Sequence, residues 1–299
     1  LIMNHNHENI SKIAIGTVQF GIDYGINSGV KVEPNEVRKV INFARNKNIT
    51  LLDTAQLYGS SEQVLGDVNT KDFNIVTKSR GFNGDSISED ESNLVISDLH
   101  QSLKLLKRES IYAFLVHHGE DLLKPGGEKI FKKLEIIRNQ GLVKKIGISA
   151  YVDNKLEKII DRYDLDIIQL PMNILDNRLI DNGLLSKIYS KKIELHTRSV
   201  FLQGLLLMNK KNRPKKFDKW SSLWNLWHEW LSDNKLSALE ATIRYMISIP
   251  EITRVLVGVD NKDQLEMIIN ALDGNIPDVP KELSTNDVNL LNPGNWENL

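Results

Sequence analysis

Residues 51–66, "LLDTAQLYGSSEQVLG", pass from an apolar run into a segment of helical spacing, with polar residues between the two. The leucines at its start are typical of a buried strand, and its last residues are typical of an amphipathic helix. Asp53 and Tyr58 lie at the junction. In barrel enzymes built from βα units, catalytic groups occupy the carboxyl ends of the strands and the loops that follow. The stretch therefore predicts a βα unit whose loop belongs to a functional site.

The same alternation of short β-branched runs and longer helical patterns continues from residue 12 onward. Eight candidate strands lie at 12–18, 50–55, 74–79, 111–117, 144–150, 166–173, 193–200 and 254–259. Helical patterns between them include 33–48, 89–107, 127–141, 153–163 and 235–249. Eight such units in 299 residues favour an α/β fold of the (β/α)₈ TIM barrel type over two doubly wound domains.

We expect one barrel domain over residues 1–299, with a long loop at about 201–234 and a short C-terminal tail. In that loop, tryptophans and leucines within 220–231 fall three or four residues apart. This spacing favours a helix packed on the barrel, while a lid over the site is the alternative.

Charge and composition restrict the class of partner. Lys and Arg number 38 against 39 Asp and Glu, which gives no basic field for nucleic acid. There is no cysteine, and no run of about 18 apolar residues predicts a membrane span. We expect a cytoplasmic protein, a monomer or small homo-oligomer, that binds a small molecule. We interpret His5 and His7 as part of a solvated terminus, and no metal site is predicted.

Four titratable side chains lie at or after the ends of three consecutive candidate strands. Asp53 ends the second strand, Tyr58 follows it, Lys78 ends the third and His117 ends the fourth. Each alone is explained by capping, packing or solvation of a strand end. Because these strand ends meet at one mouth of a barrel, their joint occurrence indicates a catalytic group.

The chemistry of this group is proton transfer to an oxygen. A phenol with a pKa of about 10 is a weak acid at neutral pH, and an ammonium beside it lowers that pKa. We expect Lys78 to act in this way on Tyr58, with Asp53 keeping Lys78 charged. His117 would orient a substrate carbonyl beside the Tyr58 hydroxyl.

Several motifs resemble the aldo-keto reductase superfamily: "LLDTAQLYGSSEQVLG", "IVTKS", "FLVHH", "KKIGIS", "DIIQLPMN" and "RSVFLQGLL", in order over about residues 12–272. The resemblance implies a (β/α)₈ barrel that binds NAD(P)H and reduces carbonyls to alcohols. It places the family's catalytic tetrad on Asp53, Tyr58, Lys78 and His117, the same four residues.

The resemblance also implies the residues that bind the cofactor. Around the nicotinamide they are Thr17, Ser149, Gln169 and Arg198, the last in place of a stacking tyrosine; at the pyrophosphate they are Ser199, Phe201, Gly204 and Leu205; at the adenosine end they are Gly258, Asp260 and Gln264. The cations that many family members use for a 2′-phosphate are missing there, and Asp260 adds a negative charge. The coenzyme stays open between NAD and NADP; these changes favour NAD, whereas Lys262 offers a cation for NADP.

The wording of "GTVQFGIDYGI", "LVHHGEDLL" and "LLNPGNW" resembles a bacterial subgroup of polysaccharide and nucleotide-sugar pathways, which implies a sugar or sugar-like carbonyl. Loop positions suggest Tyr24, Arg80 and His118 as substrate contacts.

The leading hypothesis is thus an NAD(P)-dependent oxidoreductase with Tyr58 as general acid or base. The main alternative is a nicotinamide-binding regulatory subunit on the same barrel. A lyase with Lys78 as a Schiff-base amine and a metal hydrolase on His117 and His118 are weaker alternatives. For the last, adjacent residues of a strand are expected to point to opposite faces.

Overall fold

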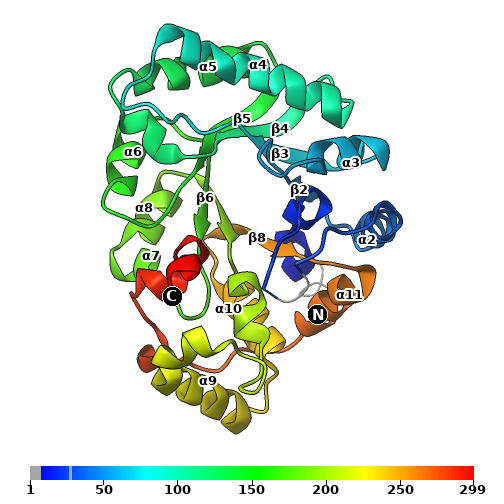
Figure 1. Ribbon diagram of the computed structural model, residues 1–299, viewed down its shortest axis with the longest axis vertical. Coiled ribbons are helices and arrows are strands. Elements are labelled where there is room, and N and C mark those ends of the chain that lie inside the picture. The colour runs from blue at the N-terminus through cyan, green and yellow to red at the C-terminus, as the bar shows by residue number, and fades with distance from the viewer. Residues whose placement is uncertain (1–7, 27–28) are drawn as a thin grey trace.

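Eight parallel strands, hydrogen-bonded in sequence order, close into a barrel (Figure 1). The computed structural model describes residues 8–26 and 29–299, so His5 and His7 lie outside the described residues. The strands are β1 (Ile13–Gly16), β2 (Leu51–Asp53), β3 (Asn74–Lys78), β4 (Ile111–Val116), β5 (Val143–Ser149), β6 (Ile167–Pro171), β7 (Glu194–Arg198) and β8 (Ile252–Gly258). The predicted (β/α)₈ barrel is confirmed, and each strand lies at its expected place in the chain.

Helices cover the outside of the barrel (Figure 1). They are α2 (Pro34–Asn46), α3 (Ser61–Asp67), α4 (Glu89–Leu106), α5 (Gly127–Asn139), α6 (Leu156–Arg162), α7 (Arg178–Asp181), α8 (Leu184–Ser190), α9 (Ser221–Asp233), α10 (Ala238–Ser248), α11 (Lys262–Ala271) and α12 (Val288–Leu291). Local signals explain where several begin. Pro34 opens α2, and Ser88 with Glu91 forms a capping box on α4.

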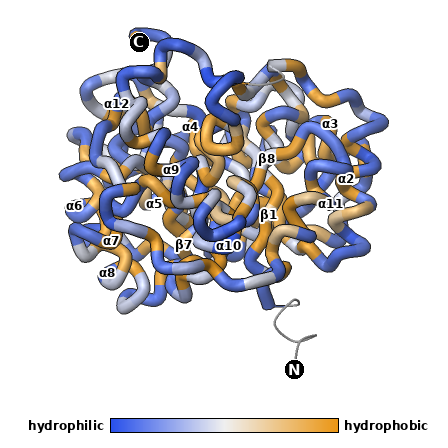
Figure 2. The backbone as a smooth tube through the Cα atoms, turned by 90° about the horizontal axis from the view of Figure 1, so that it is seen from below, coloured by the Kyte–Doolittle hydropathy of each residue, from blue (hydrophilic) through white to orange (hydrophobic). Residues whose placement is uncertain are grey.

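The apolar residues of the strands form the centre of the molecule. Figure 2 shows the hydrophobic colour on strands such as β1, with hydrophilic residues toward the outer loops. Strand β1 is shorter than expected because the chain enters a 3₁₀ helix at Val18–Phe20. That turn brings the residues after β1 across the carboxyl end of the barrel, where the pocket described below lies.

The segment after β7 is more ordered than the expected loop at 201–234. It forms 3₁₀ helices at Leu202–Leu207 and Lys215–Trp220, followed by α9. Trp224 and Trp227 of α9 are buried in a second apolar cluster together with Trp296 of the C-terminal tail. The tryptophan stripe is therefore packing, as its spacing favoured, because its buried face lies against the tail.

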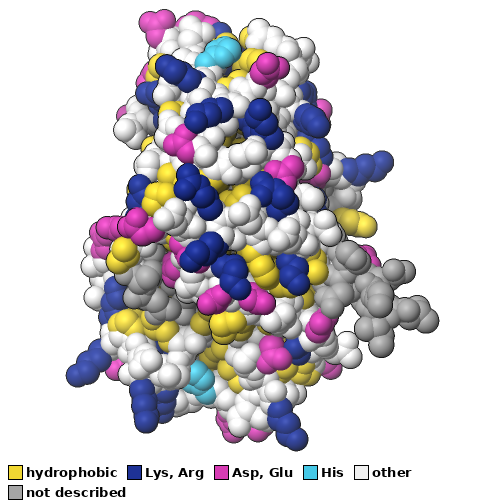
Figure 3. Space-filling view, turned by 90° about the vertical axis from the view of Figure 1, so that its right-hand side faces the viewer, with side chains coloured by type: hydrophobic (Ala, Val, Ile, Leu, Met, Phe, Trp, Pro, Cys, Tyr) yellow, Lys and Arg dark blue, Asp and Glu magenta, His cyan; other side chains and the backbone are white. Residues whose placement is uncertain are grey.

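No helix in the described part of the chain is both long and apolar enough to cross a membrane. On the face drawn in Figure 3, basic and acidic side chains are interspersed. This face has no large area of a single sign of charge.

Candidate active site

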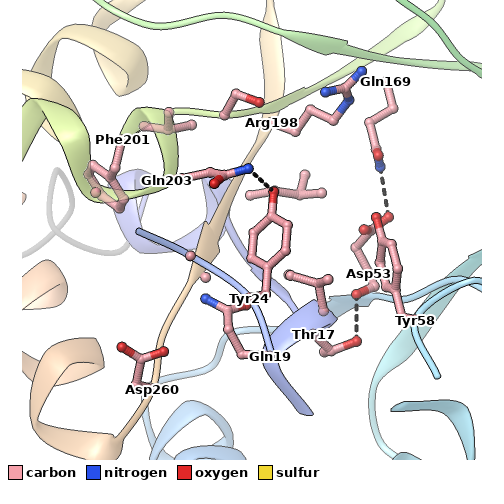
Figure 4. A pocket seen from close by; sticks show the side chains of 18 of the residues that line it. Thr17, Gln19, Tyr24, Asp53, Tyr58, Gln169, Arg198, Phe201, Gln203 and Asp260 are labelled. Atoms are coloured by element: carbon pink, nitrogen blue, oxygen red, sulfur yellow. Dashed lines mark hydrogen bonds between the residues drawn. The ribbon is translucent and has the colours of Figure 1, made fainter. Parts of the chain in front are cut away.

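A pocket of about 480 Å³ opens at the carboxyl ends of the strands (Figure 4). Most of the predicted site residues line it: Thr17, Tyr24, Asp53, Tyr58, His117, His118, Ser149, Gln169, Arg198, Ser199, Phe201, Gly204, Gly258, Asp260 and Gln264. Lys78, Arg80 and Leu205 do not. The barrel thus brings residues from most of its strand ends to one cavity, as parallel closure requires.

Lys78 lies beneath the pocket in a buried ion pair with Asp53. Its Nζ donates to both carboxylate oxygens, at 2.9 and 2.8 Å, and to the Thr54 carbonyl at 2.9 Å. The side chains are 0% and 3% exposed. An ammonium has three donor hydrogens, so these bonds occupy all of them. Buried charges persist only when paired in this way, and the pairing fixes the position of the Lys78 ammonium beside the pocket.

Tyr58 lies directly beside this pair. The Lys78 Nζ is 5.1 Å from the centroid of the Tyr58 ring, and the ring meets His117 edge to face at 6.0 Å between centroids. Because the donors of Lys78 are already engaged, the ammonium acts on the phenol through space and through its ring face. This arrangement differs from a direct Lys78–Tyr58 hydrogen bond.

Two glycines allow the Tyr58 loop to approach the loop after β1. A Cβ at Gly21 would lie 1.7 Å from the Tyr58 carbonyl oxygen, and one at Gly59 would lie 2.6 Å from the Gly21 carbonyl oxygen. Gly59 also has a φ of +57°, which favours glycine. The "YG" dipeptide of the opening stretch therefore allows a close backbone contact that fixes the position of Tyr58.

His117 is held as a neutral imidazole. Burial lowers its pKa to about 3, and the nearby positive charges of Lys78, His118 and Arg198 act in the same direction. A neutral ring carries one N–H donor and one acceptor nitrogen. At ordinary pH, His117 can therefore donate a hydrogen bond to a substrate oxygen without carrying charge.

His118 also lines the pocket, with its ring centroid 5.4 Å from that of His117. The expectation that the two point to opposite faces was wrong, because β4 ends at Val116 and strand alternation no longer applies. Even so, the described residues contain no group of three or more His, Asp or Glu side chains arranged to hold a metal ion.

The loop after β7 forms another wall of the pocket, and several of its residues have positive φ values. Ser199, Gln203 and Gly204 have φ values of +59°, +53° and +94°. Gln203 Nε2 donates to the Tyr24 hydroxyl at 3.2 Å (Figure 4), and burial raises the pKa of Tyr24. The hydrogen bond joins the loops after β1 and β7 across the pocket.

Two predicted contacts lie elsewhere. Leu205 is fully buried in the second apolar cluster, because the turn at Gln203–Gly204 directs it into that core. Arg80 pairs with the buried Asp98 of α4 at 2.6 Å, so its guanidinium braces a helix. Neither side chain reaches the cavity.

Arg198 lies in the wall as predicted, held by its neighbours. Its Nη2 donates to the Ala150 carbonyl at 3.1 Å, and its guanidinium carbon is 4.6 Å from the Tyr151 ring centroid. Tyr151 was missed from the sequence because no periodic pattern marks the loop after β5. The other lining residues that were missed include Val18, Gln19, Val200, Gln203, Leu239, Met267 and Ile268.

The turn after β8, predicted to hold the adenosine end of the cofactor, lines one end of the pocket. The Asp260 N–H donates to Gln264 Oε1 at 2.8 Å, which ties this turn to the first turn of α11. Lys262 does not face the cavity: its Nζ is paired with Glu266 at 2.7 Å and with Asp263 at 3.1 Å. The cation that the sequence offered for a 2′-phosphate thus has two acidic partners outside the cavity.

The polar atoms of the pocket fit an amide-bearing, hydroxyl-rich cofactor. Within residues 8–26 and 29–299, Gln19 Oε1, His117 Nδ1 and Gln169 Oε1 are buried atoms without a hydrogen-bond partner. Ser149 adds a hydroxyl to the same wall, whereas the Thr17 hydroxyl already bonds the Asp53 carbonyl and the Ser61 hydroxyl. Buried polar atoms are normally paired, so the unpaired atoms are available to a ligand.

The fold and pocket define a (β/α)₈-barrel protein whose site lies at the carboxyl ends of the strands. The model of the aldo/keto reductase family matches residues 12–282, and the chain belongs to that family. Proteins of this family are oxidoreductases that use nicotinamide cofactors.

Solved structures agree with the fold. The aldo-keto reductase AKR11C1 from Bacillus halodurans, in its holo form, superposes with a TM-score of 0.72 at 18% identity, covering 91% of this chain and 89% of that one. The glycerol dehydrogenase AKR11B4 from Gluconobacter oxydans gives a TM-score of 0.68 at 18% identity, covering 89% and 88%. At this identity the likeness concerns the fold alone. No curated protein sequence matches the chain.

Proposed function

We propose that this protein transfers hydride between NAD(P)H and a carbonyl or hemiacetal carbon, with Tyr58 as the general acid or base. The observation that carries the proposal is the buried Asp53–Lys78 pair set against the Tyr58 ring, beside a neutral His117. Such a group delivers a proton to an oxygen that becomes negative. Nothing in this arrangement requires the Lys78 amine to act as a nucleophile, because its donors are engaged with Asp53 and Thr54.

Each of the four residues has its own role in the proposed reaction. His117 donates its single N–H to the substrate oxygen and so orients it toward Tyr58. Tyr58 gives its hydroxyl proton to that oxygen, and the fixed charge of Lys78 stabilises the phenolate that remains. Asp53 keeps Lys78 charged and in place. When bound, the reduced nicotinamide supplies the hydride.

The cofactor would lie along the wall formed by the ends of β5–β8. Thr17, Ser149, Gln169 and Arg198 would hold the nicotinamide half, and the turn at Ser199–Gly204 would hold the pyrophosphate. For the adenosine end we infer a preference for NAD, supported by the carboxylate of Asp260 and by the pairing of Lys262 with two acids.

We infer a sugar or sugar-like substrate. Tyr24, His118 and Tyr151 line the pocket beside Tyr58, and flat rings of this kind pack against the apolar faces of a sugar. The resemblance of three sequence segments to a polysaccharide and nucleotide-sugar subgroup supports the same substrate class.

The test compares Tyr58→Phe with wild type in two assays. The first is a fluorescence titration with NADH and NADPH, which measures cofactor binding. The second is stopped-flow measurement of NAD(P)H oxidation in the presence of a panel of aldehydes and sugars. We expect Tyr58→Phe to bind cofactor normally and to lose turnover by about 10²–10⁴-fold. Tyr189→Phe is the matched control: it removes a phenolic hydroxyl from an exposed residue outside the pocket and should behave as wild type. Wild-type turnover in Tyr58→Phe would refute the assignment. Cofactor binding by wild type without turnover on any substrate would favour the regulatory subunit.

A further inference from the structure

From the pocket downward, the inside of the barrel holds a row of polar side chains. Gln169 of β6 is the register partner of His196 of β7, and His196 is the partner of Arg254 of β8. Paired residues on neighbouring strands point to the same face, and Gln169 reaches across the barrel to Asp53 at 2.7 Å. The three side chains therefore point into the interior from consecutive strands, in a row that begins with Gln169 at the pocket and runs down to Arg254.

A bulge brings Arg254 into this row. Leu195 pairs with Ile252, but His196 pairs with Arg254, so Thr253 is an extra residue in β8. The Thr253 hydroxyl accepts from the Leu195 N–H at 3.2 Å in place of a backbone partner. A bulge changes the direction of the side chain that follows it. Without this bulge, Thr253 and not Arg254 would be the register partner of His196.

Each of the three residues has a buried polar atom that lacks a hydrogen-bond partner among the described residues: Gln169 Oε1, His196 Nδ1 and Arg254 Nε. Gln169 is 1% exposed and His196 is 0% exposed. A buried polar atom left without a partner is costly. Three such atoms on consecutive strands indicate one shared partner.

The hydrogen-bonding roles of two of these atoms follow from their other contacts. Asp53 accepts from Lys78 and is a carboxylate, so the Gln169 atom that faces it must be the amide nitrogen, and Oε1 is an acceptor. Hydrogen bonds from His196, Lys145 and Tyr112 outweigh burial and lower the pKa of Glu194 to about 2, so it too is a carboxylate.

His196 must then donate to Glu194 through Nε2, over 3.3 Å. Burial lowers the pKa of His196, so the ring is neutral and its other nitrogen, Nδ1, is an acceptor. Arg254 Nε–H can only donate. The three residues thus present two acceptors and one donor.

We propose that Gln169, His196 and Arg254 bind one buried water, which donates to Gln169 Oε1 and His196 Nδ1 and accepts from Arg254 Nε. Water has this combination of donors and acceptors, and buried waters typically make about three hydrogen bonds. An anion would face two acceptors, and a metal ion or ammonium would face the guanidinium charge. Because an amide oxygen accepts two hydrogen bonds, Gln169 can serve the cofactor pocket as well.

The water completes a hydrogen-bond chain through the barrel. The chain runs from Asp53 through Gln169, the water and His196 to Glu194, which is held by Lys145 and Tyr112. It fixes the Gln169 amide in the orientation that holds Asp53 against Lys78. Arg254 is therefore a positioning residue, and this role, unlike the water site itself, rests on the proposed function.

Two substitutions of Arg254 separate the donor from the bulk of the side chain. Arg254→Gln places an amide nitrogen where Nε lies, and Arg254→Met places a methyl group there. High-resolution crystal structures should show the water in wild type and in Arg254→Gln, and its loss or displacement in Arg254→Met. Absence of the water from wild type, or a direct bond from Arg254 Nε to Gln169 or His196, would overturn the proposal.

Nitrogen-15 NMR of histidine-labelled protein gives a readout that needs neither crystals nor activity. We expect His196, assigned with a His196→Gln variant, to be the neutral Nε2–H tautomer; an Nδ1–H tautomer would overturn the proposal.

The positioning role is tested by kinetics. We expect Arg254→Met to lose about tenfold in kcat, the rate equivalent of one hydrogen bond, with KM and cofactor affinity unchanged. Arg254→Gln should recover most of that loss. Wild-type kcat in Arg254→Met would overturn the positioning role. Failure of wild type to turn over any carbonyl would instead refute the proposed function, and the structural and NMR tests of the water would still decide the site.

Discussion

At the scale of the residue, the site depends on charges and polar atoms that are buried from bulk solvent. Lys78 and Asp53 are held together by two hydrogen bonds, and Gln169 adds a third to the same carboxylate. The positive charge of Lys78 thereby lies in a fixed position under Tyr58. The same burial keeps His117 neutral, so a fixed cation and an uncharged donor lie on two sides of one phenol.

Asp53→Asn is expected to reduce the free energy of unfolding by about 3–5 kcal/mol, because it leaves the Lys78 charge buried without its counterion. Urea denaturation followed by tryptophan fluorescence measures this change in the free energy of unfolding. Asp67→Asn is the matched control: its pair with Lys107 is exposed, at 48% and 58%, and should contribute under about 1 kcal/mol. Similar losses in the two variants would contradict the buried pair's importance.

His117 makes stability depend on pH. Its pKa of about 3 in the folded protein lies below its ordinary value of 6.5, so the unfolded chain binds the proton first. Its contribution is complete above about pH 6.5 and declines as pH falls toward 3, by about 1.4 kcal/mol per pH unit. His117→Gln should flatten the plot of unfolding free energy against pH between about 6 and 4 by that slope. Parallel plots for variant and wild type would show that His117 titrates normally.

At the scale of the element, the loop that carries Tyr58 is positioned by contacts between loops. The loop after β2 packs against the loop after β1 through Gly59 and Gly21, and the hydroxyl of Thr17 donates to the Asp53 carbonyl at 2.8 Å. The Thr17 and Ser61 hydroxyls lie 2.8 Å apart, which ties the first residue of α3 to the same point. Tyr58 is thus placed from both sides of its loop.

Gly59→Ala is expected to displace this loop and lower kcat by at least tenfold, because the new Cβ would meet the Gly21 carbonyl at 2.6 Å. Gly141→Ala is the matched control. Gly141 has a φ of +75° but nothing within 4 Å of the added Cβ, so it should lose only about 1 kcal/mol of stability and keep full activity. Equal activity in the two variants would show that the loop tolerates the contact.

At the scale of the whole molecule, the chain builds a second apolar cluster beside the barrel. Residues from the loop after β7, from α9 and from the C-terminal tail meet there, with Phe217 against Trp296 at 4.9 Å between ring centroids. The cluster also holds Leu202 and Leu205, which flank the pocket-lining turn at Gln203–Gly204. The tail therefore supports one wall of the pocket from behind.

Trp296→Ala is expected to reduce the free energy of unfolding by about 3–5 kcal/mol through the cavity it leaves. Hydrogen exchange should rise in α9 and in Leu202–Leu207 but not in β1–β4. Val288→Ala, an exposed position in the same tail, should leave exchange unchanged. Faster exchange spread evenly over the barrel would argue against a separate cluster.

Local patterns in the sequence predict the eight strands, their order and the four titratable residues at their ends. Alternation and apolar runs report burial within one element, and the closure of a parallel barrel then brings the ends of its strands together. That is why Asp53, Tyr58 and His117 were found together from spacing alone, and why Lys78 was expected beside them.

The tertiary structure decided what lies between the elements. The partner of Arg80 is on α4, Leu205 turns into the second cluster, and His118 enters the pocket because β4 stops at Val116. No local period encodes the path of a loop or the choice of a distant neighbour, since both depend on packing between segments far apart in the chain. The bulge that aims Arg254 into the barrel is of the same kind, because it exists only in the pairing of two strands.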